Sequence, residues 1–111
     1  MNSDVEKNIF QSHVRHAILG YLTRANGYTL NCKVLKSLLH GYGLIISGDD
    51  LKSELVWLEK ETLVQLHESS DLGCLIAIAR LTEKGADTYI GAEKIDGVAS
   101  ICKDYKNTSH N

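Results

Sequence analysis

Apolar residues recur three or four positions apart along the first quarter of the chain, and this spacing predicts one long helix. They share one helical face, and its members are Phe10, Val14, Ala17, Ile18, Tyr21, Leu22 and Ala25. The stretch Ser3-Asp-Val-Glu6 has the pattern of a capping box, which marks a helix start. We expect Gly27 to end the helix in the left-handed conformation that glycine adopts easily.

Two shorter helices are predicted next. Asn31 is suited to cap the second helix, which would end at 41–43 and turn inward Val34, Leu35, Leu38 and Leu39. Ser47 is suited to cap the third helix, which runs to about Glu61 with its leucines inward. Asp49 and Asp50 fall in its first turn, where the helix dipole favours carboxylates.

The pattern then changes from helical spacing to alternation. Residues 63–68 and 74–79 predict two strands joined by a turn at 69–73, with Val64 and Leu66 facing inward. The apolar stretch 44–46 is expected to add a short third strand at the edge of this hairpin. Thr82 would cap a fourth helix that buries Ala86, Tyr89 and Ile90. The predicted order is α-α-(β)-α-β-β-α.

This order predicts a mainly α fold with a small antiparallel β-hairpin, the arrangement of a winged helix-turn-helix. A chain of 111 residues is of the length of one domain. We assign residues 1–93 to the winged-helix domain and residues 94–111 to a C-terminal extension that is partly frayed.

The charge distribution is uneven, although the formal net charge is only −2. Residues 1–46 carry five Lys and Arg against two Asp and Glu, a net charge of +3. Residues 47–71 carry two Lys against seven Asp and Glu, a net charge of −5. Because proteins that bind DNA by neutralising phosphates present a basic face, such a face would have to come from the first half.

The composition indicates the cellular compartment in which the protein is expected. No apolar run approaches the length of a membrane span, and the first residues lack the pattern of a signal peptide. The three cysteines are far apart and odd in number, which favours free thiols in a reducing compartment. We therefore expect a cytoplasmic protein without a membrane partner.

Short motifs in the second half resemble known DNA-binding families. The stretch Leu58-Glu-Lys-Glu-Thr-Leu-Val64, followed by a hairpin and Arg80-Leu-Thr-Glu-Lys-Gly-Ala86, is similar to bacterial MarR, PadR and ArsR winged-helix regulators. More narrowly, Gly27-Tyr-Thr-Leu-Asn31, Leu55-Val-Trp-Leu58 and Leu81-Thr-x-x-Gly85 resemble small winged-helix proteins of Mu-like phages and prophages. The resemblance implies a small transcription regulator of prophage origin that binds double-stranded DNA.

Two features depart from these families. Such proteins often have glycine at the exit of the third helix, where φ is positive, and this chain has Thr62. Because a β-branched residue is disfavoured in that conformation, we expect a different geometry there. The third helix and the hairpin tip are also acidic, whereas DNA-binding members present cations or amides to the DNA.

The candidate DNA-binding residues lie on the second and third helices. In this fold the third helix enters the major groove and the second crosses the DNA backbone. The predicted contacts are Lys33, Lys36, Ser47, Lys52 and Ser53. Arg15 and Arg24 are further cations of the same basic half.

Other functions remain open. The alternative is a protein-binding module that meets a basic partner through Asp49, Asp50, Glu54 and Trp57; a structural role in a phage-like element is a third reading. A homodimer through the first helix and the C-terminal tail is also expected.

Catalytic and metal chemistry are not indicated. His13 and His16 alone do not provide the three or four convergent ligands of a metal site. No nucleophile motif or phosphate-binding glycine loop occurs. We therefore predict neither an enzyme nor a cofactor.

Overall fold

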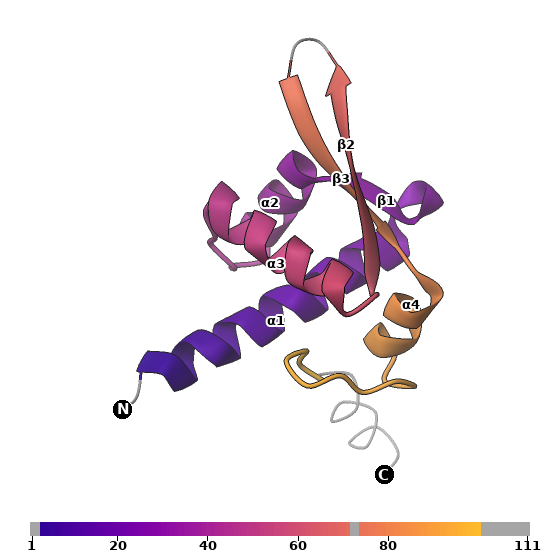
Figure 1. Ribbon diagram of the computed structural model, residues 1–111. Coiled ribbons are helices and arrows are strands. Elements are labelled where there is room, and N and C mark those ends of the chain that lie inside the picture. The colour runs from indigo at the N-terminus through magenta and orange to yellow at the C-terminus, as the bar shows by residue number, and fades with distance from the viewer. Residues whose placement is uncertain (1–2, 72–73, 101–111) are drawn as a thin grey trace.

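The protein has a helical body with a small three-stranded antiparallel sheet, one hairpin of which extends outward (Figure 1). The computed structural model describes residues 3–71 and 74–100, with side chains described except at 70–71 and 74–76. The elements are α1 (Ser3–Arg24), the 3-10 turn η1 (Asn26–Tyr28), β1 (Thr29–Asn31), α2 (Cys32–Gly41), α3 (Gly48–Lys60), β2 (Val64–Asp71), β3 (Cys74–Leu81) and α4 (Glu83–Tyr89).

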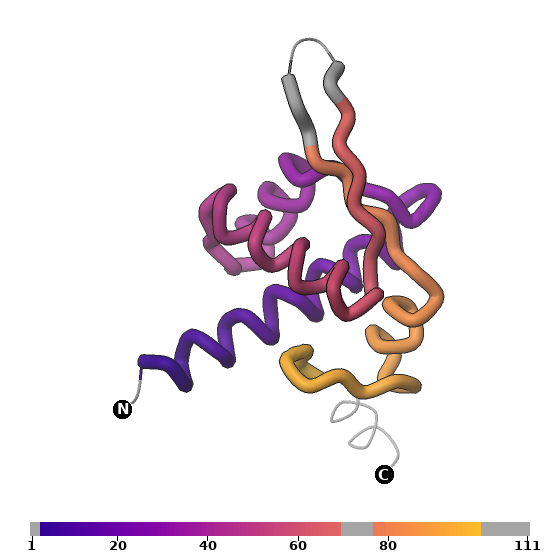
Figure 2. The backbone as a smooth tube through the Cα atoms, viewed as in Figure 1, coloured from indigo at the N-terminus to yellow at the C-terminus, as the bar shows by residue number. Residues whose placement is uncertain are grey.

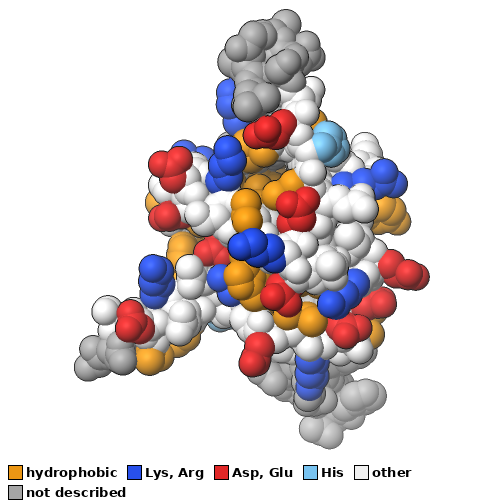
Figure 3. Space-filling view, in the orientation of Figure 1, with side chains coloured by type: hydrophobic (Ala, Val, Ile, Leu, Met, Phe, Trp, Pro, Cys, Tyr) orange, Lys and Arg blue, Asp and Glu red, His pale blue; other side chains and the backbone are white. Residues whose placement is uncertain are grey.

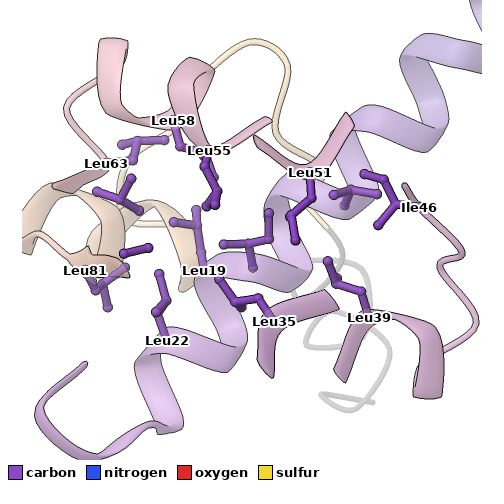
Figure 4. Close-up of a cluster of buried hydrophobic side chains, with 14 residues drawn as sticks. Leu19, Leu22, Leu35, Leu39, Ile46, Leu51, Leu55, Leu58, Leu63 and Leu81 are labelled. Atoms are coloured by element: carbon purple, nitrogen blue, oxygen red, sulfur yellow. The ribbon is translucent and has the colours of Figure 1, made fainter. Parts of the chain in front are cut away.

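The long first helix is the centre of the packing, as its apolar periodicity predicts. It contacts α2, α3, α4 and β3. Its buried residues include Leu19 and Leu22, and these meet leucines of α2, α3 and the start of the hairpin (Figure 4). The core members from those elements are Leu35, Leu39, Leu51, Leu55, Leu58 and Leu63. This packing fixes which side of α3 stays outside.

Three of the predicted helix starts are confirmed by capping hydrogen bonds. Asn31 Oδ1 accepts the Val34 N–H at 2.9 Å, and Ser47 Oγ accepts the Asp50 N–H at 3.1 Å. Thr82 Oγ1 accepts a third such bond, from the Gly85 N–H at 3.0 Å. Each cap satisfies a backbone donor that the first turn of a helix leaves without an intrahelical partner.

Some residues expected inside are exposed. Phe10 is 37% exposed because the first residues of α1, 3–10, extend beyond the body. Val34 is 42% exposed in the first turn of α2, and Ile90 is 63% exposed because α4 ends at Tyr89. Leu19, left out of the predicted face, is fully buried.

The third strand lies elsewhere than predicted. The strand order is β1-β3-β2, and β1 pairs with β3 so that Leu30 faces Ala79. Residues 44–46 form no strand because their polar backbone groups find other partners: His40 Nε2 lies 3.0 Å from Ile46 O and 3.3 Å from Ile46 N. Gly27, at φ 66°, turns the chain so that 29–31 can join the sheet instead.

The hairpin strands are longer than expected. β2 and β3 pair from Val64 opposite Leu81 to Asp71 opposite Cys74, so part of the predicted turn is strand. The remaining connection, 72–73, lies outside the described residues. Val64 is buried and Gln65 exposed, which confirms the predicted alternation. The backbone trace in Figure 2 shows β2 continuing beyond the helices.

The backbone at the exit of α3 differs from the expected geometry, in which Thr62 would avoid a positive φ. Thr62 has φ 63°, so the chain keeps the left-handed turn without glycine. The turn is held from both sides: Leu63 N–H donates to Leu58 O at 2.9 Å, and Thr82 N–H donates to Leu63 O at 3.1 Å. The surrounding hydrogen bonds therefore impose a conformation that threonine by itself disfavours.

After α4 the chain returns to α1. The Ala99 N–H donates to Ser12 O at 3.1 Å, and Ile95 and Val98 pack against the core. Of the extension predicted at 94–111, which was expected to be partly frayed, residues 101–111 lie outside the described part of the chain.

Candidate nucleic-acid interface

One side of α3 faces solvent along the whole helix. Leu51, Leu55 and Leu58 point into the core. The exposed residues lie on the other side and are Asp49, Asp50, Lys52, Ser53, Val56, Glu59 and Lys60. Figure 3 shows acidic and basic side chains interspersed on the face that contains α3 and the hairpin. Both glutamates of α3 make contacts inside the molecule.

Glu54 is the first of these. We expected it on the exposed acidic face, but it is only 4% exposed, and its Oε1 atom lies 2.6 Å from Arg15 Nε on α1. The two charges neutralise each other, so neither is available to a partner. This removes Glu54 from the predicted protein-binding residues and Arg15 from the predicted basic ones.

Glu59 is the second. Its Oε2 atom accepts the Leu66 N–H of β2 at 3.0 Å. β2 is an edge strand, so this backbone donor faces away from β3 and would otherwise need water. The carboxylate of Glu59 therefore serves the joint between α3 and the hairpin.

Trp57, another predicted protein-binding residue, also contacts other segments of the chain. It is half-buried, and the Arg15 guanidinium lies 3.9 Å from its ring centroid in a cation–π arrangement. A Cβ added at Gly97 would come within 2.9 Å of the Trp57 ring, so the segment after α4 covers the tryptophan closely. Trp57 is thus enclosed by the chain's own segments.

The remaining predicted residues lie at the surface. Lys52 and Ser53 are exposed near the middle of α3, and Lys33 is exposed and Lys36 half-buried on α2. The hydroxyls of Ser47 and Ser53 form hydrogen bonds within α3. Ser53 Oγ donates to Asp49 O at 3.2 Å, and Ser47 Oγ caps the helix. Asp49 and Asp50 lie in the first turn of α3, and Asp49 falls on the same side of the helix as Lys52 and Ser53.

A hollow of about 170 Å³ lies between α3 and the hairpin. Apolar atoms form most of its surface, and its lining includes Val56 of α3 and Leu66 and Ala77 of the strands. Hydrophobic side chains are visible between α3 and the hairpin in Figure 3. Sequence reasoning missed this hollow because it depends on how closely the hairpin packs on α3.

Within 3–71 and 74–100, no three His, Cys, Asp or Glu side chains converge as a metal site would require. Cys32 is a half-buried free thiol. None of the helices in the described ranges combines the length and apolar character needed to cross a bilayer.

No protein-family model matches the chain, and comparison with curated proteins finds no match.

Proposed function

We propose that this chain is a winged helix-turn-helix protein that binds double-stranded DNA in the cytoplasm, with α3 in the major groove. The order of elements and the strand order β1-β3-β2 support this architecture, in which α2 and α3 form the helix-turn-helix and β2 and β3 form the wing. A role in transcription regulation in a prophage follows from the resemblance stated above.

The observation that carries the proposal is the internal use of Glu54 and Glu59. With Glu54 neutralised by Arg15 and one oxygen of Glu59 holding the Leu66 N–H, the exposed surface of α3 after its first turn presents Lys52, Ser53, Val56 and Lys60 beside Glu59. Lysine and serine bind phosphates and base edges, and an apolar side chain such as valine suits the methyl group of thymine. The acidity of the segment in sequence therefore overstates the negative charge that DNA would meet.

Binding to a random duplex tests the proposal. We expect fluorescence anisotropy to detect binding near about 50 mM salt, with affinity falling steeply as salt rises because counterions are released. Lys52→Gln should weaken binding and reduce the salt slope by about one if the lysine meets a phosphate. Lys33→Gln tests α2 in the same way.

Lys84→Gln on α4 is the matched control, since it removes the same charge from an element outside the helix-turn-helix. Absence of duplex binding at low salt would overturn the proposal. Equal losses in Lys52→Gln and Lys84→Gln would also count against it, because they would show a response to net charge alone.

The hollow beside Val56 favours one second candidate, a protein-binding module without DNA binding. In this reading a basic partner places an apolar side chain between α3 and the hairpin and meets Asp49 and Asp50. Val56→Glu should then abolish the complex, whereas Lys52→Gln should leave it intact. The reverse result would exclude this candidate.

We also propose that the protein forms a homodimer through the first part of α1. Val5 and Ile9 are 47% and 55% exposed in the N-terminal part of α1. Light scattering of the wild type should give twice the chain mass, and Ile9→Glu should reduce the measured mass to that of a single chain. A monomer at high protein concentration would refute the dimer.

A further inference from the structure

A second hollow lies on α1, between α4 and the connection from α2 to α3. Its volume is about 380 Å³, within the range of sites for small organic ligands. A single stripe of α1 forms its floor, consisting of His13, His16, Ala17, Gly20, Tyr21 and Arg24. Tyr89 borders it on one side, and Tyr42 and Leu44 border it on the other.

The aromatic walls are held in place by specific contacts. A Cβ at Gly20 would approach the Tyr89 ring to 2.7 Å, so glycine is what allows Tyr89 to lie against α1. Tyr21 Oη donates to Leu38 O at 3.2 Å, and Tyr42 meets the Tyr21 ring edge-on with centroids 6.4 Å apart. Tyr21 and Tyr89 are therefore held in place around the hollow, and the exposed Tyr42 ring lies at its rim against Tyr21.

The permanent charge in the lining of the hollow is positive. Arg24 is its permanent cation, and no carboxylate belongs to its lining. Among the described residues, no Asp or Glu oxygen lies within ion-pair distance of Arg24; its nearest polar contact is a long one, from Nη1 to Tyr89 Oη at 3.4 Å. Its guanidinium carbon lies 5.4 Å from the Tyr21 ring centroid.

His16 adds an independent observation. It is buried and stacked near Tyr89, with ring centroids 4.9 Å apart, and within the described part of the chain its Nε2 atom has no hydrogen-bond partner. Burial lowers its pKa, an effect that a hydrogen bond to the Tyr89 backbone opposes and that the charge of His13 strengthens. The lowered pKa favours the neutral ring, which suits contact with a flat aromatic ring.

We propose that this hollow binds a small ligand that combines a flat aromatic ring with one anionic group. The tyrosines supply faces and edges for stacking, and Arg24 supplies a planar, always charged donor for a phosphate or carboxylate. A nucleoside monophosphate and an arene carboxylate both have this chemistry. The hollow uses no residue of the exposed side of α3, so the inference stands apart from DNA binding.

The test uses the full chain and four probes followed by NMR titration: AMP, adenosine, benzoate and benzamide. We expect AMP or benzoate to shift the signals of Gly20 and Tyr42, and its uncharged counterpart to bind about tenfold more weakly or worse. Binding of AMP alone identifies the nucleotide, and binding of benzoate alone identifies the arene carboxylate.

Two variants and one control connect the signal to the hollow. Arg24→Gln should weaken binding about tenfold, and Tyr42→Ala, at a residue 64% exposed and so safe for folding, about fivefold. Arg80→Gln, at an exposed arginine of β3, should leave binding unchanged. No shift from any probe up to about 10 mM, or an equal effect of Arg24→Gln and Arg80→Gln, would overturn the proposal.

Discussion

Arg15 and Glu54, which are 39 positions apart in the chain, form a 2.6 Å ion pair that joins α1 to α3. Arg15 also covers Trp57 and donates from Nη1 to Gly97 O at 3.2 Å. A single guanidinium therefore connects the first helix, the third helix and the segment after α4. The orientation of the exposed side of α3 depends on this connection.

Breaking the pair should destabilise the fold strongly. Arg15→Met leaves the buried Glu54 carboxylate unpaired, and such a loss costs about 3–5 kcal/mol in the free energy of unfolding. Glu54→Gln should cost less because the amide oxygen can still accept from Arg15. Urea denaturation measures both, with the exposed Asp50→Asn as control; a cost for Arg15→Met no larger than that control's would contradict the assigned burial.

Gly85 should not tolerate a side chain. A Cβ there would collide with Leu63 O and lie 2.8 Å from a methyl group of Leu81, at the point where α4 closes on the base of the hairpin. Gly85→Ala is expected to lower the free energy of unfolding by about 2–3 kcal/mol. Gly41→Ala, at an exposed helical position with open space around it, should be neutral or slightly stabilising, and thermal melts of the two variants compare them directly.

Thr62 carries backbone strain that glycine would relieve. The left-handed conformation costs an L-residue about 1–2 kcal/mol, and the greater freedom of glycine in the unfolded chain offsets part of this gain. Thr62→Gly should therefore raise the free energy of unfolding by about 0.5–1 kcal/mol. Thr62→Ala keeps the unfavourable φ and should give no gain, so equal stabilities of the two variants in urea would refute the strain.

Acid should destabilise the protein through His16. The pKa of His16 in the fold is lowered from 6.5, so below about pH 6.5 the unfolded chain binds more protons than the folded one. The stability contributed by the neutral, buried ring is present above that pH and is lost as the pH falls. His16→Phe keeps an aromatic ring beside Tyr89 without a proton to bind.

The two proteins should therefore differ in their pH dependence. Between about pH 8 and pH 5, wild type should lose stability relative to His16→Phe, by at most about 1.4 kcal/mol per pH unit for one proton. Urea midpoints at several pH values measure the difference. Since the other histidines, His13, His40, His67 and His110, are common to both, parallel curves would show that His16 titrates as it does in the unfolded chain.

The sequence determined the helices and their caps, because these depend on residues close together in the chain. The apolar spacing of α1 and the capping side chains of Asn31, Ser47 and Thr82 act within a few positions of themselves. The helix and the three caps were predicted correctly, although Phe10 is exposed and Leu19 was left out of the buried face. The alternation around Val64 likewise fixed which face of β2 is buried.

Tertiary structure decided which segment joins the sheet and which charges remain exposed. Whether 29–31 or 44–46 joins the sheet depends on β3, which lies far along the chain, and the φ of Thr62 is imposed by the hydrogen bonds of Leu63 with Leu58 and Thr82. Glu54 looks like part of an acidic surface until Arg15 neutralises it from another helix. The local sequence indicates the intrinsic conformational preference of a residue. Burial and ion pairing depend on atoms that only the folded chain brings together.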